Sequence, residues 1–129
     1  MKYMLTIHTD PAGYAEATPE DLDAELKGYA SLSQELHESG AFVAGEGLQL
    51  DTATTVSVKN GERLVTDGPF AETREQLGGF YLLDCKDLDE ALDWAAKIPG
   101  AQGGAVEVRP VMDYEAARSG AAESAEAAS

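Results

Sequence analysis

The strongest constraint on the fold is the order in which two hydrophobic periodicities alternate along the chain. Apolar residues recur at helical spacing in residues 18–39 and 87–98, whereas period-two alternation typical of strands lies before, between and after these segments. The predicted strands cover residues 3–8, 41–45, 79–85 and 105–112. The order strand, helix, strand, strand, helix, strand predicts an α+β fold of the ferredoxin-like split βαβ type.

Local signals mark the ends of both helices. The Thr18 hydroxyl is placed to cap the first helix, with Pro19 directly after it, and Gly40 is a natural stop. Asp87 opens the second helix, and the dipeptide Pro99-Gly100 closes it, while residues 10–13 break the chain after the first strand. The apolar stripes expected to face the core are Leu22, Leu26, Tyr29, Leu32 and Leu36, then Leu88, Ala91, Leu92, Ala95 and Ile98.

A β-hairpin is predicted between the second and third strands of the sheet. Residues 54–59 and 62–66 alternate like strands on either side of Asn60-Gly61. Asparagine and glycine tolerate the positive φ angles of a two-residue type I′ turn. The hairpin is therefore an insertion into the split βαβ unit.

Both faces of the predicted sheet are apolar. Tyr3, Leu5 and Ile7 share one face of the first strand, while Leu82 and Leu83 point to opposite faces of a later strand. Two helices in a chain of 129 residues cover only one of these faces. A second subunit is the simplest way to bury the other apolar face, so the sequence predicts a homodimer.

Composition excludes several classes of function. The formal net charge is −15, which disfavours binding to nucleic acid or to anionic membranes, and no long apolar run predicts a membrane helix. The single cysteine, Cys85, forms no internal disulfide, and no cofactor motif or local set of metal ligands is present. We expect a cytoplasmic protein without cofactor or metal. Its acidic, alanine-rich residues 113–129 predict a largely disordered tail, and the alternative is a fraying helix after Tyr114.

Asp67, Gly68, Pro69 and Phe70 open the most distinctive segment of the chain, residues 66–81. On these residues the chain resembles the DGPF proteins of the YCII-related superfamily, and the resemblance covers residues 1–112. It implies a dimeric α/β barrel in which two sheets meet face to face. It also implies an association with extracytoplasmic-function sigma factors, because many bacterial relatives occur beside them.

The signature has two compatible interpretations. Gly68 and Pro69 restrict the backbone and make a rigid corner. This corner either places Phe70 in the core or directs Asp67 into a pocket. Arg74 and Glu75 are either surface charges or a pocket rim that binds an anion and accepts a proton.

Further site candidates lie on the strands and the first helix. The resemblance implies an acid–base histidine early in that helix, and Tyr29 stands at the matching place in this chain. His8 ends the first strand on the face shared with Thr6, and Glu46 is held between two glycines. The candidate catalytic residues are Asp67, Tyr29 and His8; the candidate binding residues are Glu46, Gly68, Pro69, Phe70, Arg74, Glu75, Tyr81 and Arg109, the last as a pair with Glu107.

Two functions follow from these candidates. The first is a dimer that binds a small molecule and transfers a proton without a cofactor, as an isomerase or lyase does. The second is a non-catalytic accessory protein whose acidic surface docks a basic, sigma-factor-related partner.

Overall fold

A computed structural model describes residues 1–69 and 75–119. The fold is α+β, and the predicted β-α-β-β-α-β order is present with the hairpin inserted into it. The elements are β1 (Lys2–Thr9), α1 (Pro11–Ala15), α2 (Pro19–Ser39), β2 (Phe42–Gly47), β3 (Thr54–Lys59), β4 (Glu62–Asp67), β5 (Gln76–Asp84), α3 (Leu88–Lys97), α4 (Gly100–Gly103), β6 (Ala105–Pro110) and α5 (Tyr114–Ser119).

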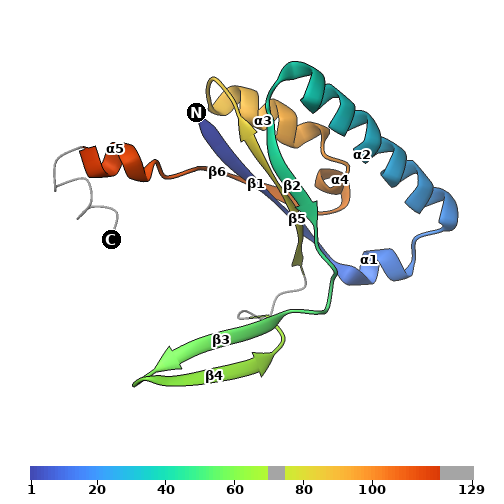
Figure 1. The fold of residues 1–129 in the computed structure, drawn as a ribbon. Coiled ribbons are helices and arrows are strands. Elements are labelled where there is room, and N and C mark those ends of the chain that lie inside the picture. The colour runs from blue at the N-terminus through green and yellow to red at the C-terminus, as the bar shows by residue number, and fades with distance from the viewer. Residues whose placement is uncertain (70–74, 120–129) are drawn as a thin grey trace.

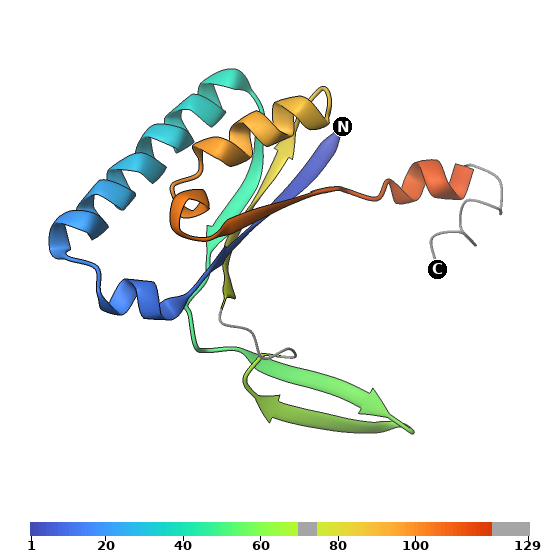
Figure 2. The same ribbon diagram turned by 180° about the vertical axis from the view of Figure 1, so that it is seen from behind.

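Four of the strands form one antiparallel sheet in the order β2-β5-β1-β6. Helices α2 and α3 cover one face of this sheet, as Figure 1 shows. Strands β3 and β4 form a separate two-stranded sheet that projects from the domain on the side away from these helices (Figure 2). The opposite face of the main sheet, called here the open face, carries no helix among the described residues.

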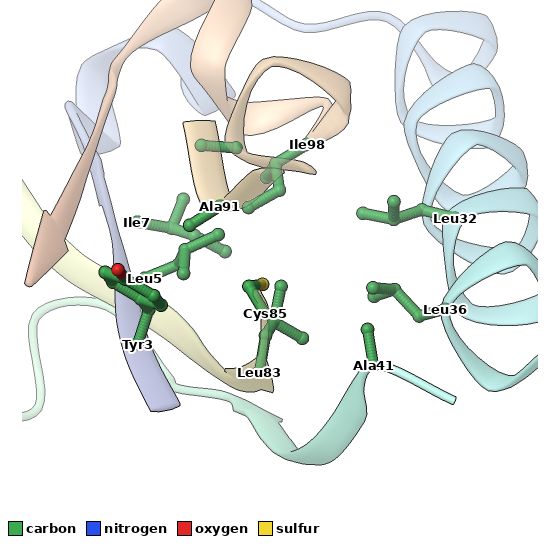
Figure 3. Close-up of a cluster of buried hydrophobic side chains, with 11 residues drawn as sticks. Tyr3, Leu5, Ile7, Leu32, Leu36, Ala41, Leu83, Cys85, Ala91 and Ile98 are labelled. Atoms are coloured by element: carbon green, nitrogen blue, oxygen red, sulfur yellow. The ribbon is translucent and has the colours of Figure 1, made fainter. Parts of the chain in front are cut away.

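The core lies between the sheet on one side and α3 and the C-terminal half of α2 on the other. Leu5 and Leu83 from the sheet meet Leu36 and Ile98, and all four side chains are fully buried (Figure 3). Met4 lies opposite Leu82 in the β1–β5 pair, on the open face. Both side chains are half-buried there, so both faces of the sheet carry apolar residues, as predicted.

The predicted capping and turn signals are confirmed. The Thr18 hydroxyl accepts from the Asp21 amide, and the Asp21 side chain accepts in return from the Thr18 amide. Gly40 ends α2 with φ of 79°. Asn60 and Gly61 take φ of 52° and 79° in the hairpin turn.

Two parts of the predicted helix stripes are wrong. Leu26 is 70% exposed and Leu22 42% exposed, because the N-terminal half of α2 slants away from the sheet and has no strand beneath it (Figure 1). In α3, Leu88 and Leu92 are both exposed while Ala91 is fully buried, since the small residues make the close contact with the sheet.

Two short helices were not predicted. Helix α1 begins at the Asp10-Pro11 break, where the Asp10 carboxylate accepts from the Ala12 amide. Helix α4 follows Pro99, where the sequence indicates only the end of α3. Both signals predict a break in the chain, and the same residues also begin a helix.

The predicted tail is helical in its first part. Residues 114–119 form α5, and residues 120–129 lie outside the described residues. Over the two described ranges, no helix combines the length and the apolar character needed to cross a membrane.

Candidate functional site

A pocket of about 410 Å³ opens between α2 and the β2–β5 side of the sheet. It exists because α2 leaves the sheet at this point, so that the core does not fill the space beneath it. We call it the tyrosine pocket; its walls are Ile7, Tyr14, Glu25, Tyr29, Ser33, Phe42, Gly45, Glu46, Gly47, Gly78, Gly79, Phe80 and Tyr81.

Glycines make room for the two inner tyrosines. A Cβ atom on Gly45 would lie 2.9 Å from Cδ1 of Tyr81, the residue paired with it across β2 and β5. A Cβ atom on Gly100 would lie 3.0 Å from the Tyr29 hydroxyl and 2.8 Å from Ile7. Both positions require the absence of a side chain for the tyrosine to keep its place.

The pocket tyrosines remain protonated at neutral pH. Burial raises the pKa of Tyr29 above its ordinary value; a hydrogen bond from the Gly100 backbone opposes this rise, and the nearby charge of Glu25 adds to it. Burial also raises the pKa of Tyr81. These phenols can therefore donate hydrogen bonds to a ligand, and they are poor bases.

Glu25 supplies a carboxylate at the mouth of the pocket. Its Oε1 accepts a hydrogen bond of 2.7 Å from the Tyr14 hydroxyl. Burial, this bond and the Glu25 charge all raise the pKa of Tyr14, so the hydroxyl keeps its proton. No other hydrogen bond or ion pair engages Glu25 within the described part of the chain, which leaves Oε2 available to a ligand.

Two neighbouring cavities extend the tyrosine pocket. One of about 540 Å³ lies beside α1 and α4 and shares Tyr14 and Glu25 with it. Another of about 180 Å³ shares Tyr14 and Tyr29 and continues to Leu48 and Leu50. Tyr14 thus lines all three hollows, and Glu25 lines the two larger ones.

The fold brings together three of the site residues predicted from sequence. Tyr29 from α2 and Tyr81 from β5 line the tyrosine pocket, and Glu46 lines it at the β2 edge, where its pairing with Phe80 places its side chain on the side of the open face. Tyr81 also contacts Phe42 edge to face, with ring centroids 6.5 Å apart. Their convergence depends on the antiparallel pairing of β2 with β5 beneath α2.

The signature residues lie elsewhere. Asp67 ends β4 opposite Thr54, is exposed, and is not part of the pocket wall. Gly68 takes φ of 109°, and its carbonyl accepts a 2.6 Å hydrogen bond from the Thr55 hydroxyl. Pro69 and Glu75 are exposed, whereas Phe70 and Arg74 lie outside the described residues. This geometry closes the base of the hairpin.

His8 and Arg109 lie on the open face instead. His8 Nε2 is 2.9 Å from the Thr6 hydroxyl and 3.6 Å from Glu107 Oε2. The same Glu107 oxygen is 3.5 Å from Arg109 Nη2, and Arg109 is 75% exposed. The predicted Glu107–Arg109 neighbourhood is present, and it forms a polar cluster separate from the tyrosine pocket.

Sequence reasoning missed three polar wall residues, Tyr14, Glu25 and Ser33. Glu25 and Ser33 lie four residues before and after Tyr29, so helical spacing places them on the same side of α2. Tyr14 had no comparable signal, because its position depends on α1. Within residues 1–69 and 75–119, no three His, Cys, Asp or Glu side chains gather as a metal-binding group.

Comparison with known proteins identifies a family, a sequence relative and a structural neighbour. The family model of the YCII-related domain matches residues 1–115. An uncharacterised protein of Rhizobium meliloti strain 1021 is 36% identical over 118 residues, which span 89% of this chain and 95% of that protein. A 5-chloro-2-hydroxyhydroquinone dehydrochlorinase of Burkholderia phenoliruptrix, solved with 2,5-dihydroxybenzoquinone, aligns with a TM-score of 0.45 and 14% identity, covering 87% of this chain and 94% of the other.

Proposed function

The chain belongs to the YCII-related family, and from that premise we propose that it binds a small carbonyl compound in the tyrosine pocket and catalyses cofactor-independent proton transfer. One observation carries the proposal: protonated tyrosines and an available carboxylate converge on one hollow of about 410 Å³. That volume suits a small organic ligand.

Glu25 and Tyr29 take separate roles in this proposal. Oε2 of Glu25 accepts a proton from a carbon next to the ligand carbonyl. The Tyr29 hydroxyl donates a hydrogen bond to the carbonyl oxygen, where negative charge develops. Return of the proton to another carbon gives an isomerisation, and loss of a leaving group gives an elimination. His8 and Asp67 take no part in this step.

A thermal-shift screen with small carbonyl metabolites tests binding, and deuterium incorporation from D₂O, followed by NMR, tests proton transfer on each hit. We expect Tyr29→Phe to weaken binding by about tenfold, the value of one hydrogen bond of roughly 1.4 kcal/mol. Glu25→Gln should retain binding and lose the exchange. Tyr114→Phe is the matched control, because Tyr114 is 68% exposed on α5, away from the pocket.

The outcomes separate binding from catalysis. If no compound stabilises the protein, or if Tyr29→Phe and Tyr114→Phe bind every hit alike, the pocket is not the binding site. If hits bind and no deuterium enters them, the protein is a binder without this chemistry.

We further propose that the protein is a homodimer joined through the open faces of two sheets. Met4, Phe80 and Leu82 are half-buried on this face, and the described helices cover only the other side. The cluster of His8, Glu107 and Arg109 shares the open face and would lie at the edge of this interface.

A further inference from the structure

The hairpin Thr54–Asp67, called here the arm, projects from the domain without support from it (Figure 1). Among the described elements, β3 and β4 pack against each other and make no contact of similar extent with any other element. An isolated two-stranded hairpin is at best marginally stable in water. Within residues 1–69 and 75–119, the arm therefore lacks a surface that would hold it in place.

Three valines share one face of the arm. Cross-strand partners share a face, and the register pairs Val56 with Val65 and Val58 with Arg63. The three valines are 57%, 67% and 57% exposed in the order Val56, Val58 and Val65. We call this surface the valine face; a strand pattern of this kind is typical of a sheet that is covered on one side.

The other face of the arm is mainly polar. Thr55 pairs with Thr66, and Ser57 pairs with Leu64. Leu64 is thus the one large apolar side chain on this side of the arm, and it is 45% exposed. The difference between the two faces indicates that docking, where it occurs, uses the valines.

The charge of the arm fits a second copy of the same chain. The arm carries Lys59 and Arg63 against Glu62 and Asp67, so it has no net charge, and the formal charge of −15 lies entirely outside it. Arg63 stands on the valine face beside Val58. Because the arm has no net charge, it approaches the acidic body of another copy without net repulsion. Arg63 favours the contact, and Asp67 shares the valine face only at the base of the arm.

The direction of the arm also favours a second copy of this chain as its partner. The arm leaves the domain on the side of the open sheet face, away from α2 and α3 (Figure 2). Two copies that meet through their open faces bring each arm beside the other copy. We propose that the valine face docks on a second copy of this chain, so that the arm of each subunit packs against its partner. This proposal adds to the homodimer proposed above and rests on it.

Sedimentation analysis of the full chain tests the proposal. The triple variant Val56→Thr, Val58→Thr, Val65→Thr keeps the β-branched shape and the β-propensity of the arm while making the valine face polar. We expect its dimer dissociation constant to rise at least about tenfold, because three exposed valines lose their burial. Leu64→Thr on the opposite face is the matched control and should change the constant less than about threefold.

A proximity measurement provides an independent check. Cys85 is buried, so Val58→Cys places one exposed thiol on the valine face for a photo-crosslinker, and Ser57→Cys places one on the opposite face. We expect covalent dimers mainly from Val58→Cys. Equal crosslinking from both positions, or a triple variant that dimerises as the unchanged chain does, overturns the arm proposal and leaves the sheet-face dimer standing. A monomer at every concentration overturns both.

Discussion

Gly45 and Gly47 stand two residues apart in β2, and only one of them is sterically required. The Cβ of an alanine at position 45 would meet the Tyr81 ring at 2.9 Å and the Phe80 carbonyl oxygen at 3.2 Å, whereas one at position 47 would meet nothing within 4 Å. The glycine at position 45 therefore fixes where the Tyr81 ring lies in the pocket. The sequence shows two similar glycines, and the pairing of β2 with β5 distinguishes them.

We predict that Gly45→Ala destabilises the protein by about 1–3 kcal/mol, because it forces the Tyr81 ring or the strand to move. Gly47→Ala should change the free energy of unfolding by less than about 0.5 kcal/mol. Urea denaturation of both variants checks this prediction. Similar losses of stability in the two variants would contradict it.

The environment of Cys85 lowers the reactivity of its thiol. Burial, together with the nearby charge of Glu90, raises the pKa of its thiol to about 11. The folded state thus favours the protonated thiol. The contribution of this thiol to the free energy of unfolding is complete below the pKa of the unfolded thiol, near 8.5, and is lost as the pH rises toward 11.

We predict that Cys85 reacts slowly with a disulfide reagent at pH 8 in the native protein and rapidly in denaturant. The reaction of the native protein should accelerate as the pH rises toward 11. Colour development with Ellman's reagent measures both rates. Equal rates in the folded and unfolded protein would show that the thiol is accessible and unperturbed.

At the scale of elements, the two halves of α2 have different structural roles. Its C-terminal half places Leu32 and Leu36 in the core, whereas its N-terminal half leaves the sheet and forms a wall of the tyrosine pocket. The helix signals in the sequence were strong and were confirmed at both ends. The spacing of apolar residues does not show where the sheet beneath the helix ends. The prediction that Leu22 and Leu26 face the core is therefore wrong.

We predict that Leu36→Ala costs about 2–5 kcal/mol of stability, because Leu36 is 1% exposed and its loss leaves a cavity. Leu26→Ala, in the same helix at 70% exposure, should cost less than about 0.5 kcal/mol. Thermal or urea unfolding of the pair checks the difference. A large loss from Leu26→Ala would mean that the N-terminal half of α2 is covered in solution.

At the scale of the whole molecule, the described residues of one chain leave the open sheet face and the arm without cover. The open face combines half-buried Met4, Phe80 and Leu82 with the cluster around Glu107, and the arm projects on the same side. The twofold partner proposed above would account for both. The signature at Asp67 and Gly68 then acts at the base of the arm, where Gly68 takes a positive φ.

We predict that Leu82→Asp, which places a charge on the open face, converts a dimer into a monomer at micromolar concentration. Leu26→Asp, the same change on the exposed side of α2, should leave the dimer intact. Light scattering after size-exclusion chromatography measures the mass of each. A dimeric Leu82→Asp protein would place the interface elsewhere.

The sequence by itself determined the order of the main elements, the capping of α2 at Thr18 and Gly40, and the Asn60-Gly61 turn. These features depend on residues close together in the chain, so local chemistry specifies them. Only the tertiary structure decided that Tyr29, Tyr81 and Glu46 share a pocket with Glu25 while Asp67 lies apart. That grouping depends on which strands pair and on where α2 leaves the sheet, and contacts between distant segments determine both.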